Sequence, residues 1–196
     1  MNIARTSIAL ALGTLFAGPA LAQTPAGTVQ RDLNQQERIE QGLQSGSLNT
    51  REAAGLENQE KKVDRLQAKD LKDGSLSPAE KAQLQKAQNR VSADIYKQKH
   101  DAQTGNPNSA SSKRMQADVQ RNVNQQARIE QGVRSGQLTN KETASLERGQ
   151  ARVNRAEAVA GADGHVGAGG QANIQAREDH QSARIYNKKH NQIEKQ

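Results

Sequence analysis

The chain contains no cysteine and no tryptophan, and its aromatic residues are one phenylalanine and two tyrosines. Without cysteine it can form no disulfide and offers no thiol ligand to a transition metal. A core made only of scattered Leu, Ile, Val and Ala stabilises the fold weakly. Burial of apolar surface contributes about 25 cal/mol per Å², while each ordered residue costs about 1–2 kcal/mol of backbone entropy. This composition argues against a deep, dry enzyme pocket, so we expect a non-enzymatic protein without a cofactor and leave homo-oligomerisation open.

The first residues, MNIARTSIALALGTLFAGPALAQ, have the pattern of a signal peptide spanning 1–22. Arg5 supplies the positive start, an apolar run follows, and Ala20-Leu21-Ala22 forms a small-residue cleavage site before Gln23. The apolar run is too short to cross a bilayer, and no later segment approaches the required length. The sequence therefore predicts a periplasmic or secreted protein with no transmembrane segment after signal cleavage.

An internal duplication accounts for most of the remaining chain. Residues 29–101 and 119–191 align without a gap at an offset of ninety, and RIEQGLQSGSLNTREAAGLE in the first copy becomes RIEQGVRSGQLTNKETASLE in the second. Repetition on this scale indicates two copies of one structural unit. Residues 102–118, AQTGNPNSASSKRMQAD, are rich in Gly, Pro, Asn and Ser and predict a flexible linker between the copies.

The apolar residues of each unit recur at helical spacing. In the first unit, stripes in residues 29–43, 56–66 and 84–95 predict three helices, and no segment shows the two-residue alternation of a strand. We therefore expect an all-α protein of two tandem three-helix units, each built from helical hairpins. The glycine-rich segment 161–172, GADGHVGAGGQA, replaces a better helix start of the first unit, so the second unit is expected to be less regular.

The repeated segment has the residues expected in a tight turn, or corner, between two helices. Gly46 can adopt the positive φ that ends one helix, and Asn49 with Glu52 matches a capping box that starts the next. Thr139 with Glu142 repeats this box in the second unit. Ser77 with Glu80 forms a further box, with proline at the first helical position.

The same corners leave a second interpretation open, as weak calcium loops. The spacing of Gly74, Leu76 and Glu80 matches positions 6, 8 and 12 of an EF-hand loop, although few of the usual carboxylate ligands are present. The alternative function is therefore weak divalent-cation binding through degenerate helix-loop-helix corners, with Asp70, Asp73 and Glu80 as ligands.

Both units end in related segments, IYKQKHD and IYNKKHN. A tyrosine and a histidine four residues apart share a helix face, and a neighbouring lysine adds charge. These ends predict small basic-aromatic patches for an anionic partner, formed by Tyr96, Lys99 and His100 and by Tyr186, Lys189 and His190. The simpler interpretation is a favourable helix end, because His and Lys near a C-terminus complement the helix dipole.

The remaining classes of function have little support in the residues. The sequence contains no nucleophile elbow, phosphate loop or HExxH pattern, and its four histidines show no metal-ligand spacing. The formal net charge of +7 comes from bases mixed with acids along the chain, and no nucleic-acid recognition motif is present. We therefore do not expect nucleic acid as a partner.

The pattern RIEQGxxSGxLxxxE with a terminal IYxxKH resembles small exported proteobacterial proteins of uncharacterised function, over both units. A looser similarity links Leu138-Thr139 followed by Glu142 to the LTxxQ signature of periplasmic stress chaperones of the Spy and CpxP type. These resemblances imply export, helical hairpins and a stress- or chaperone-like role. Together with the composition, they suggest a protein that acts by contact with a protein or an anionic envelope component.

Overall fold

A computed structural model describes residues 24–191, and this range contains six α-helices and no strand. The all-α prediction is therefore confirmed. The helices are α1 (Pro25–Ser45), α2 (Thr50–Asp70), α3 (Pro78–Lys99), α4 (Ala110–Arg134), α5 (Asn140–Ala160) and α6 (Ala168–Lys189). The expected signal peptide lies outside the described residues, and no helix within them is long and apolar enough to cross a membrane.

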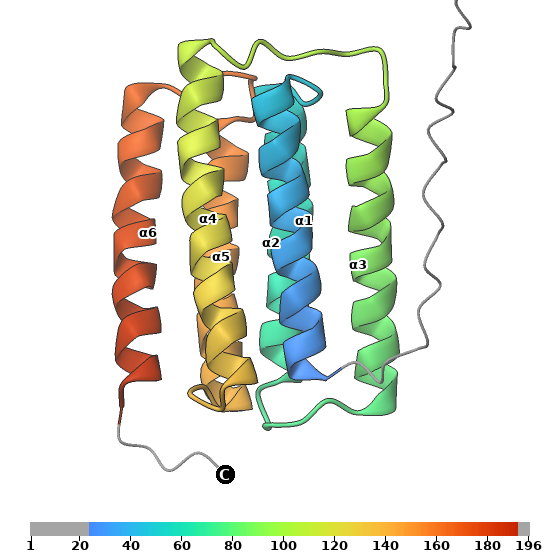
Figure 1. The fold of residues 1–196 in the computed structure, drawn as a ribbon, viewed down its shortest axis with the longest axis vertical. Coiled ribbons are helices and arrows are strands. Elements are labelled where there is room, and N and C mark those ends of the chain that lie inside the picture. The colour runs from blue at the N-terminus through green and yellow to red at the C-terminus, as the bar shows by residue number, and fades with distance from the viewer. Residues whose placement is uncertain (1–23, 192–196) are drawn as a thin grey trace, which may run out of the picture.

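Equivalent helices of the two repeats pair with each other. The most extensive packing joins α2 to α5 and α1 to α4, and the partners run in opposite directions (Figure 1). These four helices form a central bundle, with α3 packed on the side of α1 and α2 and α6 on the side of α4 and α5. The repeats therefore share one interior and are not separate units held only by a linker.

Apolar contacts across the repeats confirm this shared interior. The largest cluster joins Ile39 and Leu43 of the first repeat to Met115, Val119 and Val166 at the start of α4 and before α6. A second cluster places Val29 of α1 among side chains of the second repeat, Ile129, Leu138, Leu146 and Ile185. Each repeat lacks enough large apolar groups to bury its own helices, and the pairing supplies the missing partner surface.

The corners between helices have the predicted geometry. Gly46 has φ of 77° and ends α1, and Asn49, Ser77 and Thr139 each form a complete capping box with the acid three residues later. Gly42 has a further role, because a Cβ built on it would lie 2.5 Å from Cδ1 of Leu48. In this repeated segment, Leu48, which follows the turn, therefore packs directly against Gly42 of α1.

Two sequence expectations are wrong in part. The linker predicted over 102–118 is helical from Ala110, since Ser109 caps α4 and Met115 is fully buried. The third helix of the second unit is complete in spite of the glycines, because α6 and α3 are both 22 residues long. Gly167 provides no side-chain cap to α6, but Val166 is buried and donates its N–H to Ser111 Oγ over 2.8 Å. Tertiary contacts therefore replace the missing local signal.

Candidate functional site

The two tyrosine-histidine pairs form the same local structure at the ends of α3 and α6. The rings of Tyr96 and His100 stack with centroids 4.2 Å apart, and those of Tyr186 and His190 do the same. Tyr96 and Tyr186 remain 62% and 57% exposed. Because α3 and α6 end at opposite ends of the molecule (Figure 1), the two pairs do not form one continuous surface.

The lysines beside these pairs make contacts within the molecule. Lys99 Nζ donates to the carbonyl oxygen of Arg38 over 3.3 Å, and Lys189 Nζ donates to that of Arg128 over 3.2 Å. Each lysine therefore joins the last turn of a flanking helix to a helix of the central bundle. Tyr96, His100, Tyr186 and His190 are the more accessible members of these predicted patches.

The corner residues considered for calcium are divided between different roles. Glu80 accepts hydrogen bonds from the N–H and the hydroxyl of Ser77 in the capping box, which lowers its pKa. Asp73 accepts from the N–H of Ser75 within the turn, and Asp70 is buried, which raises its pKa. Among the described residues, these three do not form a group whose oxygens converge.

A basic face on the back of the bundle is the main electrostatic feature that the sequence did not reveal. The exposed charged residues of α5 are all basic, while its three acids, Glu142, Glu147 and Glu157, are buried. In α2 the exposed charged residues are again all basic, and four of its five acids are buried. We call this the basic face and define it by Lys62, Arg65, Arg148, Arg152 and Arg155.

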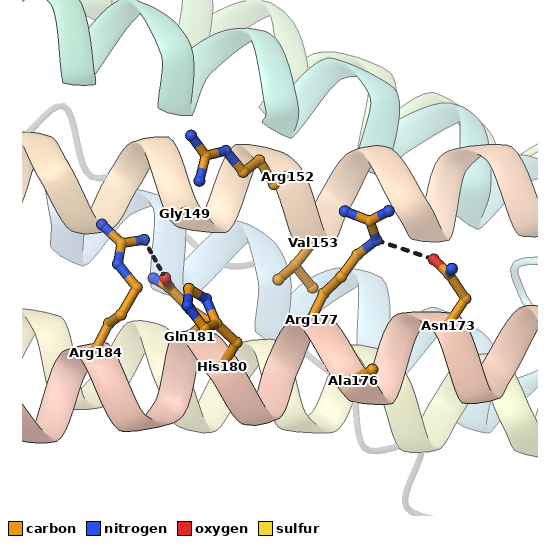
Figure 2. A pocket seen from close by; sticks show the side chains of 9 residues that line it. All are labelled: Gly149, Arg152, Val153, Asn173, Ala176, Arg177, His180, Gln181 and Arg184. Atoms are coloured by element: carbon orange, nitrogen blue, oxygen red, sulfur yellow. Dashed lines mark hydrogen bonds between the residues drawn. The ribbon is translucent and has the colours of Figure 1, made fainter.

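A groove between α5 and α6 extends the basic face. One part has a volume of about 350 Å³, is lined by Arg152, Arg177, His180 and Arg184, and is shown in Figure 2. A second part of about 770 Å³ adds Arg65 and Arg155 and shares Arg152 and Arg177 with the first. No carboxylate lines either part. Guanidinium groups on both walls make the groove suited to phosphate or carboxylate groups.

The acids absent from this face lie inside the bundle. Asp32, Glu57, Glu60, Asp64, Glu147 and Glu157 are all at most 3% exposed. Burial raises the pKa of Asp32 and of Glu57 to about 7, and hydrogen bonds from Gln88 and Gln36 lower these values in part. Burial also raises the pKa of Glu60 well above its usual range, and the charges of Asp32 and Glu57 raise it further.

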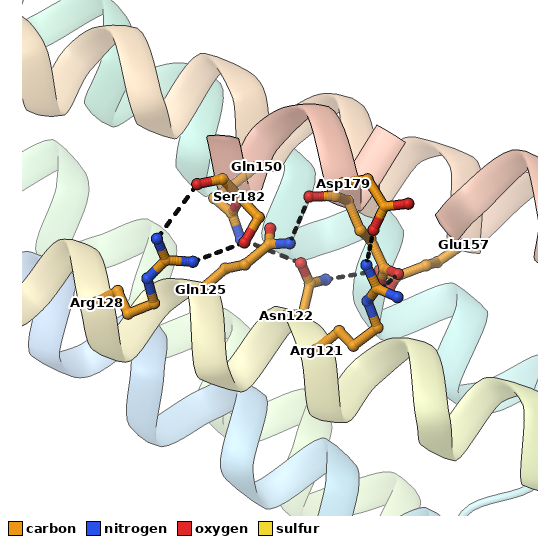
Figure 3. Close-up of polar contacts among 9 residues, drawn as sticks. Arg121, Asn122, Gln125, Arg128, Gln150, Glu157, Asp179 and Ser182 are labelled. Atoms are coloured by element: carbon orange, nitrogen blue, oxygen red, sulfur yellow. Dashed lines mark hydrogen bonds and ion pairs between the residues drawn. The ribbon is translucent and has the colours of Figure 1, made fainter. Parts of the chain in front are cut away.

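Repeat 2 has amides at several positions where repeat 1 has these acids. Asp32, Glu60 and Asp64 correspond at the offset of ninety to Asn122, Gln150 and Asn154. The amides bond to one another: Asn122 donates to Asn154 over 2.7 Å, and Gln150 donates to Asn122 over 3.1 Å. Figure 3 shows this network continuing from Asn122 to Glu157 over 2.8 Å. A carboxylate has no N–H to donate, so repeat 1 cannot build the same network.

The sequence did contain a signal for the buried acids. Glu57, Glu60 and Asp64 recur at spacings of three and four residues, beside Leu56 and Val63 of an apolar stripe. Acids normally lie on the solvated side of a helix, so the spacing alone does not identify these acids as buried.

Comparisons with known proteins do not add a family assignment. No family model matches the chain, and no curated protein or solved structure matches it.

Proposed function

We propose that this is an exported, non-enzymatic protein that binds the headgroup layer of an anionic membrane leaflet through its basic face. The observation that carries the proposal is the separation of charge on α2 and α5, where the exposed charges are basic and the acids are buried apart from the capping Glu52. The formal net charge therefore understates the positive charge that a partner would meet on this side.

The arrangement of the basic groups favours an extended partner. A helix of 21 residues, the length of both α2 and α5, is about 32 Å long, so its basic residues meet many headgroups at once. No acidic side chain pairs with Arg148, Arg152 or Arg155 within the described residues. These guanidinium groups are therefore open to phosphate, which their planar fork binds well.

Vesicle sedimentation tests this proposal with the chain from Gln23 to Gln196, which keeps all six helices. We expect binding to phosphatidylglycerol vesicles that weakens as salt rises, and little binding to phosphatidylcholine vesicles. Replacing Arg148, Arg152 and Arg155 by Gln should weaken binding on the order of 100-fold, because each basic residue near an anionic surface contributes about 1 kcal/mol.

A charge-matched variant serves as the control. Replacing Lys72, Lys86 and Lys97 by Gln removes the same number of exposed charges from the α2–α3 corner and from α3. This variant should bind much more tightly than the arginine variant. Equal losses in the two variants, or equal binding of the unchanged protein to both kinds of vesicle, would contradict a specific basic face.

A further inference from the structure

Three buried carboxylates from three helices converge inside the central bundle. Asp32 of α1, Asp64 of α2 and Glu147 of α5 each offer one oxygen, and these oxygens lie within 4.8 Å of one another. The residues are 2%, 3% and 0% exposed. They come from both repeats, so the group exists only because the repeats pack together.

Each of the three carboxylates is oriented by one amide from another helix. Asp32 Oδ1 accepts from Gln88 Nε2 over 2.6 Å, and Asp64 Oδ2 accepts from Asn154 Nδ2 over 2.9 Å. Glu147 Oε1 accepts from Gln126 Nε2 over 3.3 Å. Neighbouring donors that fix a carboxylate while leaving its other oxygen available are typical of the residues surrounding a metal site.

Several oxygens in this region have no donor. Asp32 Oδ2, Glu147 Oε2 and both oxygens of Glu60 are buried without a hydrogen bond. Glu60 is 1% exposed and lies on α2 one helical turn before Asp64, and the charges of Asp32 and Glu147 raise its pKa further. A buried acceptor without a donor costs about 1–3 kcal/mol, and more when it is charged, so these oxygens need a bound proton or a bound cation.

We propose that Asp32, Asp64 and Glu147, with Glu60 beside them, bind one oxygen-preferring divalent cation of the calcium type. The group offers only carboxylate oxygens, which favours hard ions such as Ca²⁺, Mg²⁺ or Mn²⁺ over zinc or copper. Oxygens on opposite sides of Ca²⁺ are about 4.6–5.2 Å apart, against about 4.0–4.2 Å for Mg²⁺. Because the three oxygens all lie within 4.8 Å of one another, one Ca²⁺ ion can contact all of them.

The second repeat provides an internal comparison for this site. The positions equivalent to Asp32, Glu60 and Asp64 carry amides, which hydrogen-bond to one another and carry no charge. Replacing the acids of repeat 1 by those same amides should therefore remove the cation while keeping side chains of the same shape.

The test measures calcium and manganese binding to the chain from Gln23 to Gln196 after refolding from urea, because the site is enclosed. We expect one saturable site by calorimetry and a melting temperature several degrees higher with millimolar CaCl₂ than with chelator. Asp32→Asn/Asp64→Asn should lose the binding and the shift. Asp73→Asn/Glu80→Gln, at the exposed corner, should keep both. Broadening of the electron paramagnetic resonance signal of Mn²⁺ on addition of the unchanged protein should report the bound ion directly.

The outcomes separate clearly. Absence of saturable binding by either ion in the unchanged protein, or unchanged binding by Asp32→Asn/Asp64→Asn, overturns the site. Loss of binding in Asp73→Asn/Glu80→Gln alone would place the cation at the corner and also overturns it. If the Asp32→Asn/Asp64→Asn protein does not fold, Glu147→Gln provides the second variant, and it should weaken binding at least about tenfold. Unchanged affinity in this variant overturns the site as well.

Discussion

Asn154 of α5 donates a hydrogen bond from Nδ2 to Oδ2 of Asp64 of α2 over 2.9 Å, although the two residues occupy equivalent positions of the repeat. Antiparallel pairing of α2 with α5 brings these positions together. Two aspartates here would present only acceptors to each other when ionised, whereas one amide supplies the donor. The difference between the repeats is thus part of what allows them to share one interior.

Replacing Asn154 by Asp removes this donor and adds a buried acid opposite Asp64. We expect the free energy of unfolding to fall by about 3 kcal/mol at neutral pH, because a second uncompensated carboxylate is buried. The reciprocal change, Asp64→Asn, keeps one donor and should change stability by less than about 1 kcal/mol. Urea denaturation in chelator measures both, and equal destabilisation by the two substitutions would contradict this account.

The close approach of Gly42 to Leu48 predicts a position-specific effect of alanine. Gly42→Ala should destabilise the protein by about 1–3 kcal/mol, since its Cβ would force Leu48 out of place. Gly132→Ala should behave alike, because its Cβ would lie 2.6 Å from Leu138 Cδ1. Gly55→Ala is the control: its Cβ meets no atom within 4 Å, so helix propensity should stabilise the protein by about 1 kcal/mol. The midpoints of urea denaturation compare the three variants, and a stabilising Gly42→Ala would refute the packing.

Two buried acids, Asp118 of α4 and Glu178 of α6, predict how stability depends on pH. Burial raises the pKa of Asp118 to about 7 and that of Glu178 to about 8, although Arg121 lowers both in part. Their pKa values are raised in the folded state, so their contribution is fully present below the unfolded values of 3.8 and 4.5. This contribution is lost as pH rises through about 7–8, because charging the buried acids then opposes folding.

The measurement is urea denaturation in chelator at a series of pH values. We expect the free energy of unfolding to fall between about pH 5 and 9, and the fall to be shallower in Asp118→Asn/Glu178→Gln. The exposed Asp101→Asn should retain the slope of the unchanged protein. A double variant with the same slope would show that other groups determine the pH dependence.

Substitution of Lys99 and Lys189 can show whether these lysines stabilise the fold or bind a partner. Replacing both by Met should lower the free energy of unfolding by about 1–2 kcal/mol, because each removes a charge-assisted hydrogen bond to a carbonyl. Binding to anionic vesicles should change little, since neither lysine belongs to the basic face. Lys97→Met, which removes an exposed charge from the same helix end, is the control for stability. A large loss of vesicle binding without a loss of stability would instead support the basic-aromatic ends as the contact surface.

The sequence alone determined the helices, the corners and the duplication. Capping by Asn49, Ser77 and Thr139 and the positive φ of Gly46 depend on residues only a few positions apart, so local sequence was sufficient to predict them. The end of the linker and the start of α6 could not be predicted this way. Met115 and Val166 are held there by residues distant in the sequence.

Only the tertiary structure decided which charges face water. In α2, the acids Glu57, Glu60 and Asp64 are interspersed with the apolar Leu56 and Val63. Their spacing does not show which side chains are buried, because burial depends on the helix packed against them. Pairing of α2 with α5 buries both acid-bearing sides and leaves the arginines outside. The basic face and the carboxylate group therefore have one physical origin, the burial of an interface between two copies of the same helix.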